Sequence, residues 1–266
     1  MTSFFWLNGA IHPTNEAGIS PADRGFLLGD GLYETFRFYN GRAPHLGRHF
    51  QRLAQGCQIL RLPLPDKTLI EQALLQLCEM HQLFNGSARL TVTRGIGPRG
   101  LMPPQPAQPT ILLVINPLPA HEPAPVKLIL SSHKRQRNSV LSHIKSTNTL
   151  LSIIARLEAQ DHQADDALLL NEQDFIAEAT ASNFLALRDG QLITPPIEDG
   201  ALPGISRTRL IEEGLCTESS LTSKELYKLE GAWLVTALSL TNISSINTHK
   251  LPLPEELTQS LRRFLY

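Results

Sequence analysis

The segment "PLPAHEPAP" (residues 117–125) holds four prolines in nine positions. Proline fixes φ and lacks a backbone donor, so neither a helix nor an inner strand can run through this segment. We therefore predict a linker at residues 119–125, between a small N-terminal domain (1–118) and a larger C-terminal domain (126–266). The 266 residues and 42% hydrophobic content can bury a sizeable core in each.

The N-terminal part combines strands with two helices. Asn8-Gly9 in "SFFWLNGAI" stands between apolar runs, which is typical of a tight hairpin, and Asn40-Gly41 repeats this chemistry. Apolar side chains then recur at helical spacing, as in Leu69 to Cys78. The predicted elements are helices over residues 45–60 and 66–84 and strands over 88–95 and 110–118. This part is predicted to be an α+β unit.

The C-terminal part alternates strands with helices. A strand "VKLILSS" follows the linker, and the apolar stretches after it indicate a mixed α/β domain. The remaining predicted elements are a helix after Lys145, strands over 166–171 and 175–196 with a break at Asp189-Gly190, a helix from about Ile205, a strand over 231–238 and a helix within 254–266.

Composition excludes several classes of protein. The net charge of −1, from 24 basic and 25 acidic side chains, has none of the excess positive charge that binding to nucleic acid requires. The N-terminus lacks a charged leader, and no window approaches the roughly 20 apolar residues that cross a bilayer. Cys57, Cys78 and Cys216 show no paired spacing, so we expect core thiols with neither disulfides nor a metal site. We expect a soluble, cytoplasmic protein.

Four short stretches carry the chemistry when they are taken together. They are "RGFLLGDGLYETFRF" (24–38), "RHFQRL" (48–53), "HIKSTN" (143–148) and the pair "EATASNF" (178–184) with "LPGISRTRL" (202–210). Their order and spacing resemble the class IV aminotransferases, the fold type IV enzymes that use pyridoxal 5′-phosphate (PLP). The resemblance covers essentially the whole chain. It implies an α/β (α+β) two-domain fold with the cofactor between the domains.

Lys145 is the candidate catalytic residue. A lysine just before a helix is usually solvated, so its position alone would not single it out. The resemblance places the lysine that forms a Schiff base with PLP in this "K-S-x-N" setting, at the head of a helix. An amine must be neutral to attack the cofactor's aldehyde, and the same amine can then shuttle protons. Lys134, in "SHKRQRN", lies in a polar setting that suits solvent.

Two residues are predicted to serve the pyridine ring. The ring is an electron sink only while its nitrogen is protonated, which requires a neighbouring carboxylate. The resemblance assigns that carboxylate to Glu178, followed by the small and polar "ATASNF" that allows a flat ring to approach. Asn183 is expected to order this loop.

The cofactor phosphate requires positive charge and backbone donors. Arg52 matches the family's phosphate arginine, and its planar fork suits two phosphate oxygens. Ile205 and Ser206 follow Pro203-Gly204 at a predicted helix start, where N–H groups and the helix dipole favour an anion. The resemblance places Ala237 and Leu238 in a second phosphate-facing turn.

Tyr33 and Arg99 are the candidate substrate residues, and the reaction itself stays open. D-amino acid aminotransferases carry a histidine two residues after the arginine of this loop, whereas this chain has Arg99-Gly100-Leu101. The sequence "PRGL" and the turn "TAL" are more similar to 4-amino-4-deoxychorismate lyases, although Leu101 and Thr236 depart from their usual residues. The lyase yields 4-aminobenzoate and pyruvate for folate biosynthesis. Transamination of D-amino or branched-chain amino acids is the alternative, and Glu34 suits it.

The resemblance also bears on assembly and on a non-catalytic alternative. Family members place their sites at a dimer interface, so we expect a homodimer acting on a small-molecule amine. A catalytically silent scaffold on the same fold is the remaining hypothesis, and the presence of Lys145, Glu178 and Arg52 in register argues against it.

Overall fold

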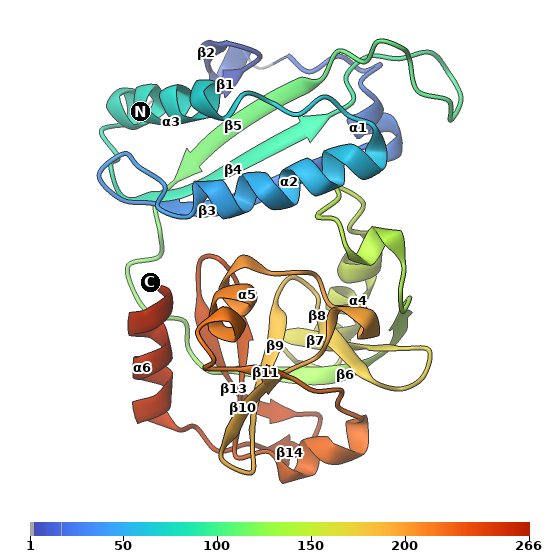
Figure 1. The fold of residues 1–266 in the computed structure, drawn as a ribbon, viewed down its shortest axis with the longest axis vertical. Coiled ribbons are helices and arrows are strands. Elements are labelled where there is room, and N and C mark those ends of the chain that lie inside the picture. The colour runs from blue at the N-terminus through green and yellow to red at the C-terminus, as the bar shows by residue number, and fades with distance from the viewer. Residues whose placement is uncertain (1–2, 17) are drawn as a thin grey trace. The chain divides into compact units, whose positions relative to one another are not determined.

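The computed structural model describes residues 3–16 and 18–266, and the chain packs as two compact units (Figure 1). The first unit comprises Met1–Pro119 together with Ile144–Asn148, and the second comprises Ala120–His143 and Thr149–Tyr266. Each unit has its own sheet and its own hydrophobic core. Within the described residues, no helix combines the length and apolarity that a bilayer crossing requires.

The first unit is a five-stranded antiparallel sheet with two long helices on one face. The strand order is β2-β1-β5-β4-β3. The elements are β1 (Phe4–Leu7), β2 (Ala10–Pro13), a 3₁₀ turn (Thr14–Glu16), α1 (Arg24–Leu28), β3 (Gly31–Phe38), α2 (Leu46–Leu60), α3 (Lys67–His81), β4 (Gly86–Thr93) and β5 (Thr110–Asn116). The predicted helices and strands of this half are confirmed, and the short helix α1 is an addition.

Two local signals explain this arrangement. Asn8 and Gly9 both have positive φ, 49° and 105°, so they close the β1–β2 hairpin as predicted. Asn40 and Gly41 also have positive φ, but the chain beyond them enters α2 after a single bridge between Tyr39 and Arg42. The second turn therefore ends a strand and does not build a hairpin.

The second unit is a nine-stranded mixed sheet with helices. Its order is β11-β10-β9-β12-β13-β6-β7-β8, and β14 pairs with β13. The elements are β6 (Val126–Arg135), α4 (Leu150–Asp161), β7 (Asp166–Asn171), β8 (Ile176–Ala179), β9 (Asn183–Arg188), β10 (Gln191–Thr194), α5 (Ile205–Glu212), β11 (Thr217–Glu218), β12 (Gly231–Val235), β13 (Leu240–Ile246), β14 (His249–Lys250) and α6 (Glu255–Leu265), with 3₁₀ turns at Val140–Ser142, Ile197–Asp199 and Ser223–Lys228. The predicted α/β class is confirmed.

The segment Ile144–Asn148 differs from the prediction. The sequence assigned all of 126–266 to the second domain and placed Lys145 at a helix head, but this segment belongs to the first unit and α4 begins only at Leu150. The physical reason is strand pairing: Tyr33 N donates to Lys145 O (2.9 Å) and Thr147 N donates to Gly31 O (3.0 Å). Ile144 is buried in the core of the first unit.

Candidate active site

Lys145 is held by backbone pairing, and its side chain remains half-buried. Its Nζ lies 4.5 Å from the centre of the Tyr33 ring, a cation–π contact. Within the described part of the chain, no carboxylate forms an ion pair with this amine. A lysine that is partly desolvated and without a counter-ion is suited to covalent chemistry.

Tyr33 lies on the sheet face opposite the helices. Side chains alternate along β3, so Tyr33, Thr35 and Arg37 share one face while the neighbouring side chains enter the core. Their cross-strand partners on β4 are Thr91, Arg89 and Ser87, respectively. The Arg89 guanidinium lies 3.9 Å from the centre of the Tyr33 ring. This face beside Lys145 is therefore polar and positively charged.

Arg52 is engaged in a buried ion pair that the sequence did not indicate. Its Nε donates to Glu34 Oε1 (2.8 Å) and its Nη2 to Glu34 Oε2 (2.6 Å), while His49 Nδ1 lies 2.6 Å from Glu34 Oε2. Glu34 lies on the core face of β3, and the two partners come from α2. One edge of the arginine fork, expected to be available to phosphate, is thus occupied by a carboxylate.

The ionisation of Glu34 makes the stability of the folded protein depend on pH. Burial raises the pKa of its carboxyl, but hydrogen bonds and charge from Arg52 and His49 outweigh burial, so the pKa lies below its ordinary value of 4.5. The lowered pKa of Glu34 therefore stabilises the folded protein at pH values above the ordinary pKa of the carboxyl. This stabilisation is lost as the pH falls through the lowered pKa of the folded state.

We expect Glu34→Gln to lower the free energy of unfolding at neutral pH by about 3–5 kcal/mol, because it removes the carboxylate that pairs with the buried Arg52. We also expect the variant to lose less stability than the wild type between neutral pH and values below 4.5. Urea unfolding over that range measures both effects. Glu71→Gln is the control, since Glu71 pairs with Lys67 on the surface; an equal loss in both variants would contradict the assignment.

Glu178 is nearly buried at the end of β8 and accepts from three donors. Arg135 Nη2 lies 3.0 Å from Oε1, and Oε2 accepts from Asn183 Nδ2 (3.1 Å) and from Leu202 N (2.9 Å). A carboxylate oxygen can accept more than one hydrogen bond. Glu178 is therefore a fixed acceptor, with Asn183 ordering it.

The helix α5 begins in a form suited to an anion. Its N-cap is Gly204, which supplies no side-chain cap, and the first intrahelical bond runs from Thr208 N to Gly204 O. The N–H groups of Ile205 and Ser206 thus have no acceptor within the helix. A Cβ at position 204 would lie 1.9 Å from Asn183 Oδ1, so only glycine permits this approach.

The turn after β12 lies beside this helix start. The Ser206 hydroxyl donates to Thr236 O (2.7 Å), which brings together the two predicted phosphate-binding segments. Thr236 Oγ1 accepts from the N–H groups of Leu238 and Ser239, each at 2.9 Å. The Leu238 N–H, predicted to face the phosphate, is therefore engaged within its own turn. Thr236 also explains why the strand predicted over 231–238 ends at Val235.

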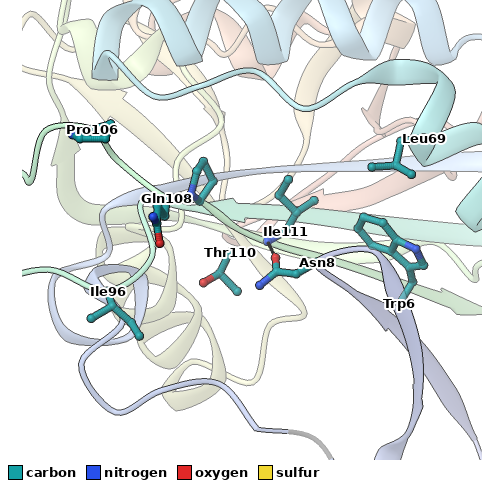
Figure 2. Close-up of a pocket in the computed structure, with 9 residues that line it drawn as sticks. Trp6, Asn8, Leu69, Ile96, Pro106, Gln108, Thr110 and Ile111 are labelled. Carbon is teal, nitrogen blue, oxygen red and sulfur yellow. Dashed lines mark hydrogen bonds between the residues drawn. The ribbon is translucent and has the colours of Figure 1, made fainter.

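Arg99 lies on an exposed loop of the first unit. A surface pocket of about 520 Å³ in the same unit is bordered by both ends of that loop (Figure 2). Its lining residues include Trp6, Ile96 and Gln108, and neither Lys145 nor Tyr33 is among them. This pocket is separate from the predicted catalytic residues.

Three residues near these groups were not predicted from the sequence. Arg89 reaches Tyr33 from the neighbouring strand β4, and Arg135 on β6 reaches Glu178 on β8 across the intervening β7. His49 joins the Glu34 pair from α2. Strand alternation could have separated Arg135 from the exposed Lys134, because adjacent strand residues face opposite sides. No local signal marks the partner that each one contacts.

Each unit contains groups of the kind that PLP requires. The first unit offers the amine of Lys145, which forms no ion pair among the described residues and suits an aldehyde. The second unit offers Glu178, a carboxylate with remaining acceptor capacity that suits a ring nitrogen, and the glycine-capped start of α5, which suits a phosphate. The fold, too, is that of the fold type IV PLP enzymes. A family model described as amino-transferase class IV matches residues 31–246, so the chain belongs to the class IV aminotransferases, which are PLP-dependent enzymes.

Three similar proteins represent three activities within this family. A putative branched-chain-amino-acid aminotransferase of Methanocaldococcus jannaschii is 32% identical, covering 91% of this chain and 87% of that protein. A D-alanine aminotransferase of Bacillus licheniformis is 27% identical, covering 82% and 76%. The crystal structure of 4-amino-4-deoxychorismate lyase from Pseudomonas aeruginosa has a TM-score of 0.84 and 30% identity, covering 97% of each chain.

Proposed function

We propose that the protein is a 4-amino-4-deoxychorismate lyase, which converts its substrate to 4-aminobenzoate and pyruvate. The observation that carries the proposal is the polar sheet face beside Lys145. The facing pairs there are Tyr33 with Thr91, Thr35 with Arg89, and Arg37 with Ser87. A branched-chain substrate would need aliphatic side chains, whereas 4-amino-4-deoxychorismate carries two carboxylates that cationic side chains can bind.

The substrate loop supports the same choice. Leu101 stands where D-amino acid aminotransferases carry a histidine, and its side chain is 82% exposed. The loop thus offers one cation, Arg99, without the neighbouring imidazole. We propose that Arg99 and Arg89 bind the carboxylates, and that Tyr33 packs against the substrate ring.

Each remaining residue has a proposed role toward the cofactor. When bound, PLP supplies an electron sink for the carbon attached to the substrate's nitrogen. Lys145 Nζ would hold the cofactor through its aldehyde, and Glu178 would keep the ring nitrogen protonated. The N–H groups of Ile205, Ser206 and Ala237 would bind the phosphate together with Arg52, whose orientation Glu34 fixes. Leu238 would support this turn through the hydrogen bond from its N–H to Thr236 Oγ1.

Proton transfer assigns Lys145 its second role. With substrate bound in the site, the Lys145 amine would remove the proton from the ring carbon that carries nitrogen. The carbon–oxygen bond to the pyruvyl group then breaks, the ring becomes aromatic, and the released group takes up a proton to become pyruvate. The products together contain the atoms of the substrate, so no keto-acid acceptor is consumed.

Transamination is the second candidate, because the 32% identical relative carries a branched-chain aminotransferase name. A single assay separates the two. Purified holoenzyme is incubated with 4-amino-4-deoxychorismate alone, and separately with D-alanine or leucine plus 2-oxoglutarate. We expect 4-aminobenzoate and pyruvate in equal amounts from the first mixture. Glutamate formed only in the second mixture, with no 4-aminobenzoate from the first, would overturn the lyase proposal.

We further propose a cytoplasmic homodimer. The three cysteines are buried free thiols, as suits a reducing compartment. The helix α4 presents four apolar side chains at helical spacing, each 45–65% exposed: Leu150, Ile153, Ile154 and Leu157. Such a stripe on a soluble domain is typical of a protein interface.

We expect light scattering to give a mass near twice the 29.5 kDa of one chain. Leu157→Glu should shift the mass toward that of one chain, because a charge in an apolar interface is costly to desolvate. Leu215→Glu, at a 47% exposed leucine outside α4, is the control and should leave the dimer intact. A single-chain mass for the wild type would contradict the proposal.

A further inference from the structure

The loop between β4 and β5 has little packing of its own. Arg99, Gly100, Leu101 and Met102 are all exposed, with Leu101 and Met102 at 82% and 79%. Ile96 at one end of the loop, and Pro106 with residues 108–111 at the other, border the pocket shown in Figure 2. Contacts from elsewhere in the first unit must therefore hold the tip of the loop in place.

Arg24 supplies such contacts from a buried position. Its side chain is 3% exposed, and its Nη1 and Nη2 donate to the carbonyls of Gly100 and Leu101, both at 2.8 Å. Its backbone N donates to Gly95 O (2.9 Å) at the start of the loop. Arg24 thus forms hydrogen bonds with the loop on both sides of Arg99.

Glycines give Arg24 access to the loop. A Cβ at Gly97 would lie 2.6 Å from Arg24 Cδ, so a larger residue there would displace the arginine stem. Gly100 has φ +104°, a conformation that favours glycine. The two glycines therefore allow the loop backbone to come close enough to accept hydrogen bonds from the Arg24 guanidinium.

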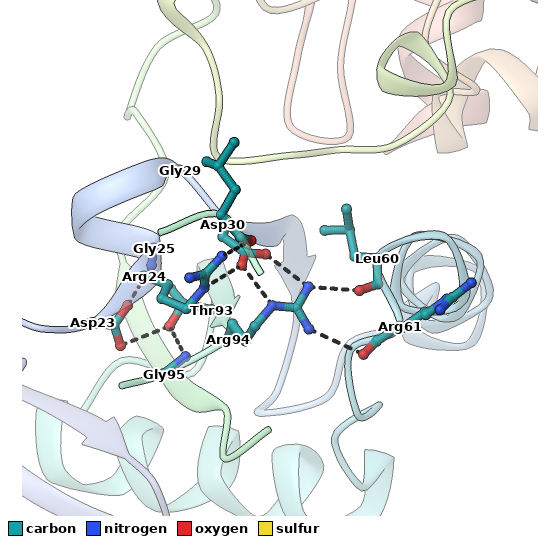
Figure 3. Close-up of polar contacts among 12 residues, drawn as sticks. Asp23, Arg24, Gly25, Gly29, Asp30, Leu60, Arg61, Thr93, Arg94 and Gly95 are labelled. Carbon is teal, nitrogen blue, oxygen red and sulfur yellow. Dashed lines mark hydrogen bonds and ion pairs between the residues drawn. The ribbon is translucent and has the colours of Figure 1, made fainter. Parts of the chain in front are cut away.

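Asp30 orients Arg24 and is shared with a second arginine (Figure 3). Arg24 Nε donates to Asp30 Oδ2 (3.0 Å), and Arg94 donates to both oxygens (2.7 and 3.0 Å). Burial raises the pKa of Asp30, but Arg94 and Arg24 outweigh burial and the pKa lies below its ordinary value. Arg94 also donates to the carbonyls of Leu60 and Arg61 at the end of α2. Two buried arginines thus share one carboxylate but hold different segments.

We propose that Arg24 is a positioning residue for substrate binding, because it fixes the loop that presents Arg99. This inference rests on the proposed role of Arg99 toward a substrate carboxylate. A guanidinium suits the task because it can donate to two adjacent carbonyls and to Asp30 from one rigid plane. A lysine ammonium is a point charge that can keep the Asp30 pair but cannot reproduce this planar geometry.

The matched pair Arg24→Met and Arg94→Met tests the proposal in the holoenzyme. Both variants keep an aliphatic stem and leave Asp30 with one arginine, so both should lower the melting temperature. Only Arg24→Met should release the loop. We expect trypsin under native conditions to cleave after Arg99 at least about tenfold faster in Arg24→Met, because cleavage follows local opening. The fragments 1–99 and 100–266, identified by mass, report this site alone.

Kinetics provide the second readout. We expect Arg24→Met to raise KM at least about tenfold with kcat nearly unchanged, the pattern of losing an interaction that is equally strong in the ground state and the transition state. Arg94→Met should leave KM unaltered. Arg24→Lys should fall between the wild type and Arg24→Met in both readouts. Equal cleavage rates in the two methionine variants, or faster cleavage without a change in KM, would overturn the positioning role. Proteolysis needs no turnover, so it is independent of whether the wild type forms 4-aminobenzoate.

Discussion

Lys145→Ala is expected to reduce kcat by at least about 10⁴-fold, since covalent activation and the proton shuttle are lost together. The purified variant should lack the visible absorbance of a covalently held cofactor, and borohydride should leave no cofactor attached to the protein. The fold should survive, because Lys145 is tied to β3 through its backbone carbonyl and its side chain is only half-buried.

Lys134→Ala is the matched control for this loss. Lys134 is the competing lysine of the same region, and its Nζ pairs with the exposed Asp174 at 2.5 Å. Removing an exposed pair changes stability by less than about 1 kcal/mol, and turnover should stay at the wild-type level. A borohydride-stable cofactor adduct in Lys145→Ala, located by peptide mapping to another lysine, would refute the assignment.

Glu178→Gln is expected to keep the cofactor but lower kcat by about 10²–10³-fold, the range seen when one group that stabilises developing charge is removed. A neutral amide cannot hold the ring nitrogen protonated, so the electron sink weakens. The amide preserves the size of the side chain, and Asn183 and Leu202 remain as neighbours. The absorbance spectrum checks cofactor retention, and single-turnover kinetics isolate the chemical step.

Glu172→Gln is the control for Glu178. Glu172 accepts from the backbone N of Arg137 and is exposed, so the same substitution there should leave kcat unchanged. If Glu178→Gln retained full kcat with bound cofactor, another group would have to hold the ring nitrogen protonated. If Glu178→Gln lost part of its cofactor but the cofactor still bound kept the wild-type spectrum, the carboxylate would have a purely structural role.

The elements that the sequence predicted well are those with local causes. The Asn8-Gly9 turn, the helices α2 and α3 and the Asp189-Gly190 turn follow from positive-φ residues and from helical spacing within a few residues. Turn chemistry and periodicity act over short stretches, so they can be seen without the rest of the chain. The extra helix α1 is only five residues long and provides too little periodicity to detect.

The candidate site shows a different balance. Lys145, Glu178 and the Gly204 helix start could be selected because their motifs occur in a recognisable order along the chain. Their partners could not. Arg135 lies 43 positions before Glu178, and the two pair only because the sheet places β6 and β8 on either side of β7. Arg52 is a second example. The sequence indicated a phosphate contact for its guanidinium but gave no sign that the same group donates to Glu34.

The amino-acid sequence by itself determined the family, most of the strands and helices, and which side chains are candidates for the chemistry. Only the tertiary structure showed that the backbone of Lys145 pairs with β3 in the first unit and that Glu34 accepts hydrogen bonds from Arg52. It also showed that Arg24 donates to a carbonyl 76 positions away. The physical reason is that hydrogen bonds and ion pairs are formed by geometry in space, and residue order constrains that geometry only over a turn or two of chain.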